Sequence, residues 1–291
     1  MYILDTSALR SIGTAPLRER ASQTPVAISP VTFYEILCHL DESNFQLHKA
    51  NLARCGIPNI LPDPFADHAA RSGVAQLVNQ TRFEEPRVIR EVLRLLTTTN
   101  TLEEFYATSI PEADGRQRPM RDIAARARSE LDRHQREFTT MMQSTIEEVR
   151  TDLLNPGGGT VTDTNLAQYI GRSCYNLFQN YQTDVPNLDQ NARSRVFAST
   201  YAYQGYLTCR AISYARSNGN VDPNDCEDWY ISMHVDILRP DTFVTDDGGT
   251  RQALNQALSL FPHIAAPGVK INSRIITTQQ FREEVQQQAT P

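Results

Sequence analysis

Residues 2–9 read YILDTSAL. The apolar run 2–4 is typical of a short buried β-strand. Asp5 ends this run, and the hydroxyl side chains of Thr6 and Ser7 can cap a helix directly after it. The stretch therefore predicts a strand that leads into a helix, with an aspartate at the junction.

A second unit of the same kind follows. Residues 25–29, which read PVAIS, have the composition of another buried strand. Ser29 and Pro30 then supply the cap and the first turn of a helix, and apolar residues recur along 31–40 at helical spacing. This β-α-β-α order favours a parallel sheet with helices on its faces.

The middle of the chain has a different character. Residues 61–216 are dominated by long helical patterns, and they predict an all-α insertion. The apolar periodicity over 119–154 predicts one long helix or a kinked pair. The segment 156–159, PGGG, is expected to break it, and further helices are expected from Thr162 to about 181 and over 189–216.

The alternating pattern returns in the last quarter of the chain. The expected elements are a helix over 224–238, a strand over 242–245, a helix over 250–260, a strand near 274–277 and a short helix from 279. Residues 1–60 and 217–291 therefore predict a single discontinuous domain. We expect a three-layer α/β/α parallel sheet, which the insertion 61–216 interrupts.

Composition excludes several classes of protein. No apolar run among the 291 residues reaches the length of about 18–20 that a membrane span needs. The sequence YILD follows Met1 directly, so we expect no secretory signal, a cytoplasmic protein and no membrane partner. The five cysteines form no C-x-x-C pair, which argues against a disulfide framework or a structural zinc site. The net charge of −6 argues against a generally basic nucleic-acid coat.

Acidic residues stand where the carboxyl ends of the strands are expected. Asp5 ends the first strand, and Asp246 and Asp247 follow the strand 242–245. Glu35 lies in the first turns of the helix after the second strand. Functional loops of parallel sheets lie at the carboxyl ends of the strands. If the first and the late strand are neighbours, these carboxylates converge in one cleft.

A further acidic pair lies on the helix expected over 224–238. Asp225 and Asp228 are spaced i, i+3, so both can project from one helical face. Clustered carboxylates raise one another's pKa values unless cations neutralise them. Mg²⁺ and Mn²⁺ prefer such all-oxygen surroundings, and they promote hydrolysis at phosphorus. The residues predict a Mg²⁺- or Mn²⁺-dependent phosphodiesterase.

Four segments resemble, in this order, the four acidic motifs of the PIN-domain nucleases: YILDTSAL, SPVTFYEIL, NDCEDWYISMHV and FVTDDGG. The resemblance implies a parallel α/β/α fold and cleavage of RNA with divalent metal ions. It assigns the catalytic and metal-binding positions to Asp5, Glu35, Asp228 and Asp247, with Asp225 as an additional ligand. The long insertion departs from the compact form of this family.

Other residues near these motifs have two interpretations each. Ser7 and Thr245 can orient ligands or water, or they can serve as a helix cap and a strand-end hydrogen-bond partner. Asp246 is expected to point away from the site or to support it. His234 is expected to be a packed helix residue.

The segment 114–136 holds seven arginines and four acidic residues. It lines a path for RNA through phosphate contacts, or it forms a solvated helix face. The residues expected to contact nucleic acid in the first case are Arg116, Arg118, Arg121, Arg126 and Arg128.

The leading hypothesis is thus a metal-dependent endoribonuclease with an RNA substrate. The resemblance adds the role of a toxin or defence effector that an inhibitory protein partner restrains. Two alternatives stay open: a nuclease specific for DNA or for a nucleic-acid structure, and a non-catalytic module that binds RNA or protein. A homo-oligomer is also left open.

Overall fold

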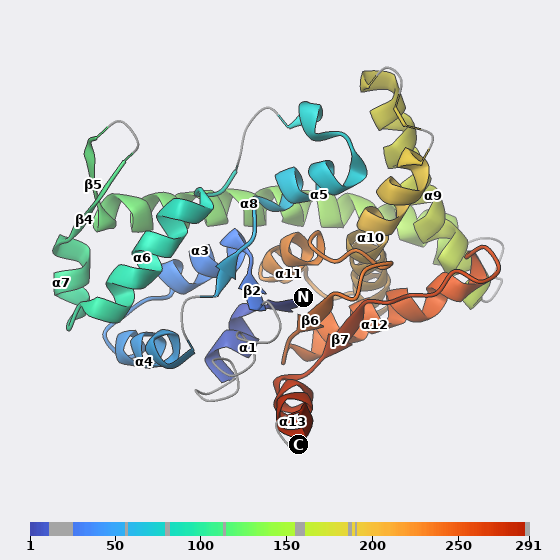
Figure 1. The fold of residues 1–291 in the computed structure, drawn as a ribbon. Coiled ribbons are helices and arrows are strands. Elements are labelled where there is room, and N and C mark those ends of the chain that lie inside the picture. Colours follow the sequence, from blue (N-terminus) through green and yellow to red (C-terminus); the bar gives the residue numbers. More distant parts are fainter. Residues whose placement is uncertain are drawn as a thin grey trace.

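The centre of the protein is a five-stranded parallel sheet with the strand order β3-β2-β1-β6-β7 (Figure 1). The computed structural model describes residues 1–11, 26–55, 58–78, 82–112, 115–154, 161–185, 188–189 and 191–288. The strands are β1 (Tyr2–Leu4), β2 (Val26–Ile28), β3 (Asn59–Ile60), β6 (Thr242–Val244) and β7 (Arg274–Ile276). The predicted α/β class and parallel sheet are confirmed.

Strand β1 lies between β2 and β6, as the site prediction requires. Leu4 is in register with Ile28 on one side and with Val244 on the other. The backbone N–H of Asp5 donates to the carbonyl oxygen of Val244 at 3.2 Å. Every residue of these three strands is buried, which is typical of a parallel sheet covered on both faces. Their carboxyl ends therefore meet at one edge.

Helices follow the strands closely. The helices of the two terminal segments are α1 (Thr6–Ser11), α3 (Pro30–Cys38), α4 (Phe45–Cys55), α11 (Asp225–Ser232), α12 (Gly248–Leu260) and α13 (Thr278–Gln288). Helix α3 begins as its sequence predicts: Pro30 occupies the first turn, and the hydroxyl of Ser29 accepts from the N–H of Val31 at 3.3 Å.

Helix α11 ends earlier than the apolar pattern predicts. It was expected to reach residue 238, but it ends at Ser232 and turns follow. The guanidinium of Arg71 donates to the carbonyl oxygens of Met233 and His234. In a longer helix, these two carbonyl oxygens would accept hydrogen bonds from backbone N–H groups of the next turn. The side chain of Arg71, from the insertion, donates these hydrogen bonds instead.

The segment 61–216 is mainly helical. Its helices are α5 (Pro64–Ser72), α6 (Pro86–Thr98), α7 (Leu102–Ala107), α8 (Met120–Val149), α9 (Asp163–Asp184) and α10 (Ala192–Ser217). The predicted long helix is confirmed: α8 spans most of the molecule and continues into a π-helical turn, Arg150–Leu154 (Figure 1). The expected break at 156–159 lies outside the described residues.

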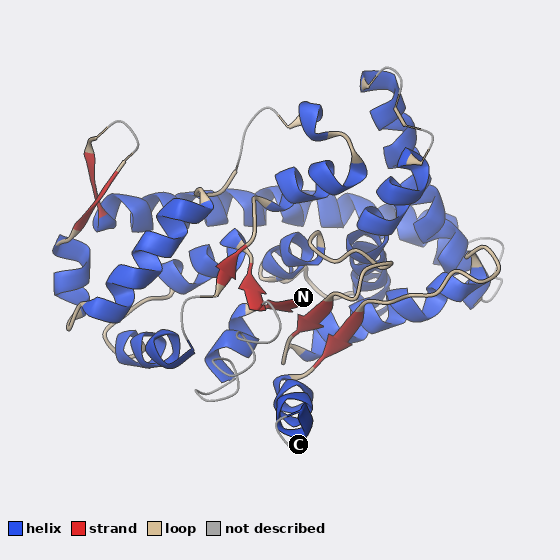
Figure 2. Ribbon diagram, in the orientation of Figure 1, coloured by secondary structure: helices blue, strands red, loops and turns tan. Residues whose placement is uncertain are grey.

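The expectation of an all-α insertion is wrong at one place. Strands β4 (Ser109–Pro111) and β5 (Gln117–Pro119) form an antiparallel hairpin that lies apart from the main sheet (Figure 2). Of the residues of β4 and β5, Ile110 alone is buried. An alternating apolar pattern, the usual sign of a strand, is therefore absent from these short segments.

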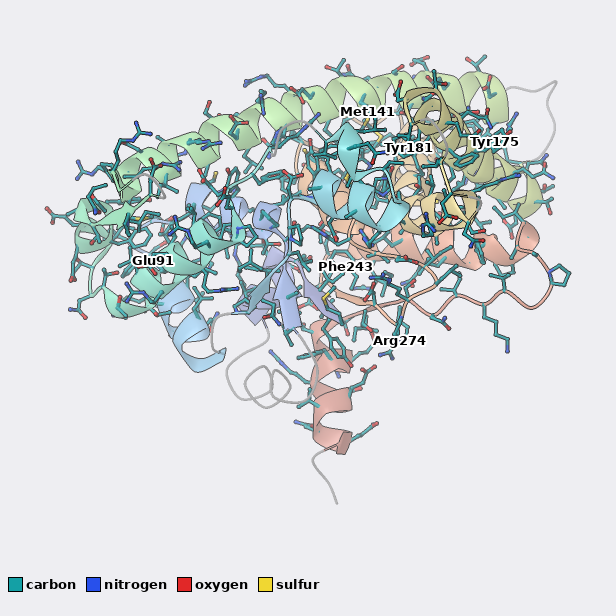
Figure 3. All side chains as sticks on the ribbon, turned by 45° about the horizontal axis from the view of Figure 1, so that its top comes forward. Glu91, Met141, Tyr175, Tyr181, Phe243 and Arg274 are labelled. Atoms are coloured by element: carbon teal, nitrogen blue, oxygen red, sulfur yellow. The ribbon has the colours of Figure 1, made fainter. Side chains whose placement is uncertain are left out.

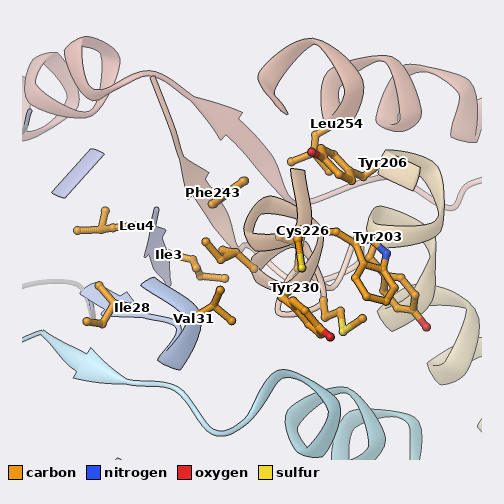
Figure 4. Close-up of a cluster of buried hydrophobic side chains, with 14 of the residues drawn as sticks. Ile3, Leu4, Ile28, Val31, Tyr203, Tyr206, Cys226, Tyr230, Phe243 and Leu254 are labelled. Atoms are coloured by element: carbon orange, nitrogen blue, oxygen red, sulfur yellow. The ribbon is translucent and has the colours of Figure 1, made fainter. Parts of the chain in front are cut away.

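One hydrophobic core joins the insertion to the sheet. Ile3, Val31 and Phe243 belong to the same buried cluster as Tyr203 and Tyr206 of α10, and Figure 4 shows Cys226 and Tyr230 between the two groups. Figure 3 labels Phe243 at the sheet and Met141 at the long insertion helix α8, which extends across the molecule. No helix among the described residues is long and apolar enough to cross a membrane.

Candidate metal centre

A pocket of about 810 Å³ lies at the carboxyl edge of the sheet. It is lined by the four acidic residues that the sequence assigns to the site: Asp5, Glu35, Asp228 and Asp247. They come from the end of β1, from α3, from α11 and from the end of β6. Segments that lie far apart in the chain thus bring their carboxylates to one cavity.

Asp5 is the most tightly held of these groups. Its side chain is only 3% exposed, and it accepts from the backbone N–H of Ala8 at 2.6 Å and from the Ser7 hydroxyl at 2.9 Å. Burial raises the pKa of Asp5 to about 6, and repulsion from Glu35 adds to this, against the hydrogen bonds from Thr245, Ala8 and Ser7. Charge on Asp5 is therefore costly without a cation.

The two hydroxyl residues support the edge of the sheet. The Ser7 hydroxyl contacts the Asp5 carboxylate and accepts from the backbone N–H of Asp246 at 2.9 Å, so it links the ends of β1 and β6. The Thr245 hydroxyl is fully buried and accepts from the backbone N–H of Asp247 at 3.0 Å. Thr245 has the expected strand-end hydrogen bond, whereas the cap of α1 is Asp5 and not Ser7, because Asp5 Oδ1 accepts from the N–H of Ala8.

Asp228 reaches the pocket from α11. Its carboxylate accepts from the hydroxyl of Thr250 on α12. Burial raises the pKa of Asp228 well above its usual range, and the neighbouring carboxylates of Asp5 and Asp247 raise it further. These three acids therefore repel one another within one small volume.

The neighbours Asp246 and Asp247 have separate tasks. Asp247 lines the pocket and caps α12, because its Oδ1 accepts from the backbone N–H of Thr250 at 2.6 Å. The Asp246 carboxylate instead accepts from the backbone N–H of Thr278 at 3.0 Å, at the start of α13. Although burial opposes it, hydrogen bonding to Thr278 holds the pKa of Asp246 below its usual value. Asp246 therefore points away from Asp247, as expected.

Glu35 forms the side of the pocket next to α1. Its Oε2 accepts from the Thr6 hydroxyl at 2.5 Å, and the side chain is partly exposed. Thr6 is the first residue of α1 and directly follows Asp5. The hydrogen bond therefore connects the acid of α3 to the end of β1.

The structure does not bring Asp225 to these residues. Asp225 is buried and accepts from Arg210 through both carboxylate oxygens, at 2.8 and 2.7 Å, and from the Tyr214 hydroxyl at 2.7 Å. Arg210 thus compensates its charge with a bidentate ion pair. The pocket lining includes Asp228 and Glu227 from this helix and does not include Asp225.

Glu227 and Asp41 are acidic residues of the pocket that the sequence did not assign to the site, and Glu227 is the buried one. It lines the pocket and is only 4% exposed, and its Oε1 accepts from the Gln135 amide at 2.7 Å. Burial and repulsion from Glu35 raise the pKa of Glu227 to about 8. The acidic residues at 225, 227 and 228 indicate a site on this helix. Their spacing alone does not say which of them face the pocket.

Most of the arginines expected to contact nucleic acid lie elsewhere. Arg118 and Arg126 form ion pairs with the buried carboxylate of Glu84, at 2.5 and 3.1 Å. Arg116 and Arg121 lie at the exposed surface. Arg121 and Arg126 lie on α8, as the second interpretation expects, whereas Arg116 and Arg118 lie at the β4–β5 hairpin and not on a helix.

Arg128 is the member of this group that lines the pocket. Its guanidinium donates to the carbonyl oxygen of Cys38, in the last turn of α3, at 3.2 Å. Arg10 of α1 also lines the pocket. Two cationic side chains thus share the cavity with six carboxylates, the five named above and Asp41.

The donor set fits a hard divalent cation. In their present positions, no group of three or more His, Cys, Asp or Glu side chains in the described part of the chain is arranged to hold a metal ion. Mg²⁺, however, keeps several of its waters and usually needs only one or two direct carboxylates. Repelling carboxylates with raised pKa values provide the oxygen-rich surroundings that such an ion prefers.

Comparison of this chain with family models, with curated proteins and with solved structures finds no match. The chemistry of the pocket is therefore interpreted from its own residues.

Proposed function

We propose that the protein is a Mg²⁺- or Mn²⁺-dependent endoribonuclease of the PIN-domain type. The observation that carries this proposal is the pocket at the carboxyl edge of the sheet. Asp5, Glu35, Asp228 and Asp247 all line it, in agreement with the acidic motifs of the sequence. A cluster of repelling carboxylates is a poor structural element by itself, so a cation-dependent function accounts for it best.

In this proposal, some residues of the pocket bind the cation and another accepts a proton. A bound divalent ion supplies activation of a water molecule and stabilisation of charge on a phosphate. Asp5, Asp228 and Asp247 would hold the hydrated ion, one or two of them directly and the rest through its waters, and Ser7 and Thr250 fix the first two of these carboxylates. Glu35 uses Oε2 to accept from Thr6, so Oε1 would be the atom left to accept a proton from a water molecule.

An anionic substrate agrees with the remaining charges of the pocket. Arg10 and Arg128 line the same cavity as the carboxylates and can contact phosphate groups on either side of the cleaved bond. RNA as the substrate follows from the resemblance to PIN-domain nucleases. A toxin or defence role, an inhibitory protein partner, a homo-oligomer and a cytoplasmic location stay predictions of the sequence.

The direct test is a cleavage assay with matched single-stranded RNA and DNA oligonucleotides, in Mn²⁺ and in EDTA. We expect RNA to be cut in Mn²⁺ and not in EDTA, and Asp5→Asn to reduce the rate at least about a hundredfold. Glu148→Gln is a matched control because Glu148 is an exposed acid on α8. Undiminished cleavage by Asp5→Asn contradicts the proposal. Cleavage of DNA alone supports the DNA nuclease, and binding without cleavage supports the non-catalytic module.

A further inference from the structure

The pocket that contains the acidic residues also extends over α4 and the turn before it. The lining residues there are His39, Leu40, Asp41, Asn44, Leu47 and His48, and we call them the α4 side. Helix α4 packs beside α1, because the amide of Asn51 donates to the carbonyl oxygen of Arg10 at 3.4 Å. Arg10 stands five residues after Asp5, or roughly 7 Å along the helix. The α4 side is therefore close enough to the acids for one nucleotide to contact both.

Two polar residues of the α4 side form the turn that leads into the helix. The Asp41 carboxylate accepts from the backbone N–H groups of Ser43 and Asn44, at 2.8 and 3.0 Å. The Asn44 side chain accepts from the N–H of Asp41 at 3.0 Å and donates to the carbonyl oxygen of His39 at 2.6 Å. These contacts give both side chains a structural role, so recognition of a ligand falls to other residues of the α4 side.

Leu47 is an apolar side chain in a pocket whose lining is mainly polar. It is 52% exposed, more than any other large apolar side chain in the described part of the chain. A single exposed leucine on an open surface needs no explanation. Within a polar ligand pocket, however, such a side chain offers contact to an apolar part of the ligand. In a nucleic acid, the apolar parts are the flat faces of the bases.

His48 adds an uncharged ring beside Leu47. Its side chain is only 3% exposed, and it lines the pocket. Burial and the charge of Arg10 lower the pKa of His48 to about 4, although attraction from Asp41 opposes the shift. At pH 7 the imidazole is therefore neutral and offers one donor, one acceptor and a flat face. Since no Phe, Tyr or Trp of the described residues lines this pocket, imidazole is the ring that a base can contact there.

We propose that the α4 side binds the base of a nucleotide next to the cleaved bond, through Leu47 and His48. The inference rests on the proposed function, because it concerns the substrate of the same pocket. Proteins bind the bases of single-stranded RNA by stacking them on rings, histidine included, and by contacting their polar edges. The two cationic side chains that can contact phosphate border this side: Arg10 acts on His48, and Arg128 donates to the carbonyl oxygen of Cys38. Phosphate and base of one nucleotide thus have complementary groups in one cavity.

The test compares the four nucleoside 5′-monophosphates with ribose 5-phosphate, which has a hydroxyl group in place of the base. Isothermal titration calorimetry in Mg²⁺ measures the binding, and these ligands contain no phosphodiester bond that could be cut. For the unchanged protein, we expect at least one nucleotide to bind about tenfold more tightly than ribose 5-phosphate. Leu47→Ala and His48→Ala should each reduce this ratio to about threefold or less. Leu238→Ala, at an exposed leucine outside the pocket lining, should leave the ratio unchanged.

The outcomes separate this inference from the proposed function. Equal binding of nucleotides and ribose 5-phosphate overturns the inference, and so does a ratio that either variant leaves unchanged or a lack of nucleotide binding. If His48→Ala does not fold by circular dichroism, Leu47→Ala decides, because the exposed side chain of Leu47 can be removed without loss of core packing. Base-dependent binding by a protein that cuts no RNA supports the inference and overturns the proposed function alone. Cleavage of RNA without base-dependent binding has the reverse meaning.

Discussion

Two buried polar clusters lie close to the sheet, and they differ in how their charges are balanced. In the first, His234 contacts Asp67 through Nδ1 at 2.7 Å and Ser29 through Nε2 at 3.1 Å. Arg71 adds an ion pair to Asp67 at 3.2 Å. The second cluster is the acidic pocket, in which burial and neighbouring carboxylates raise the pKa values of Asp5 and Asp228.

By residue type, the first cluster is the more suggestive one. Its serine, histidine and aspartate have the hydrogen-bond order of a hydrolase triad. Ser29, however, is completely buried and caps α3, and His234 is 1% exposed, as expected for a packed residue. Burial lowers the pKa of His234, although Asp67 opposes the shift. The neutral ring therefore connects two satisfied partners and stabilises the fold.

The comparison teaches that charge balance separates structure from function better than residue type. A cluster whose charges and hydrogen-bonding groups are balanced by its own residues needs no ligand. A cluster whose charges stay unbalanced and face a pocket needs one.

The largest expected effect on stability comes from removing His234 from the first cluster. His234→Ala leaves Asp67 and Ser29 without their shared partner, so we expect a loss of about 3 kcal/mol in the free energy of unfolding. Urea denaturation followed by circular dichroism measures it. His263→Ala, at an exposed histidine, should change it by less than about 0.5 kcal/mol. A loss below about 1 kcal/mol would mean that the cluster is not a structural element.

A somewhat smaller effect on stability is expected when a cation binds to the acidic pocket. Mn²⁺ at a hundred times its dissociation constant should stabilise the protein by about 2.7 kcal/mol, because it binds the folded chain alone. Thermal unfolding with and without EDTA gives the shift. His234→Ala should keep this shift and Asp228→Asn should lose most of it; the reverse pattern contradicts the comparison.

Removal of one charge from the pocket should stabilise the metal-free protein. The pKa of Asp5 in the folded chain, about 6, lies above the usual 3.8. The contribution of Asp5 to stability is therefore full below about pH 4 and is lost as the pH rises through 6. In EDTA at pH 8, Asp5→Asn should gain roughly 1–3 kcal/mol, and at pH 4 this gain should vanish.

Asp67→Asn is the matched control for that measurement. Although burial opposes it, the hydrogen bond from His234 and the positive charges of Arg71 and Arg239 hold the pKa of Asp67 below its usual value. Its charge therefore stabilises the folded chain above the unfolded pKa, and its removal at pH 8 should destabilise the protein. If Asp5→Asn and Asp67→Asn changed the stability at pH 8 in the same direction, the two clusters would not differ in charge balance.

The smallest effect is expected where an acid has only a structural contact. Asp246→Ala removes the acceptor for the N–H of Thr278 and should cost about 1 kcal/mol of stability. Cleavage of RNA should stay close to that of the unchanged protein. Asp247→Ala, one residue later, should abolish cleavage. Parallel assays of both variants check the division of tasks between the two aspartates.

The sequence predicts the sheet well where its elements are long enough to show a pattern. Strands β1, β2, β6 and β7 are apolar runs with clear ends, and α8 has a sustained helical periodicity. Strand β3 has only two residues, Asn59–Ile60, and its pairing with β2 comes from the tertiary structure. Patterns of this length carry too little information.

The candidate site shows the same limit. Asp5, Glu35 and Asp247 were found because each has a fixed position relative to a strand end or a helix start. The choice between Asp225 and Glu227 depends on partners from other helices, Arg210 and Gln135. Spacing within one helix does not contain these partners, so the sequence alone could not make the choice.

The pairing of β1 with β6 also determines when the protein can fold during synthesis. Tyr2 lies in register with Thr242, so strand β1 lacks one neighbour until residue 242 has been made. At about 5–20 residues per second, the ribosome needs roughly ten seconds or more to make the stretch between them. Long-range pairing of this kind slows folding. The acidic pocket therefore assembles only after residues 225–247, which supply part of its lining, have been made.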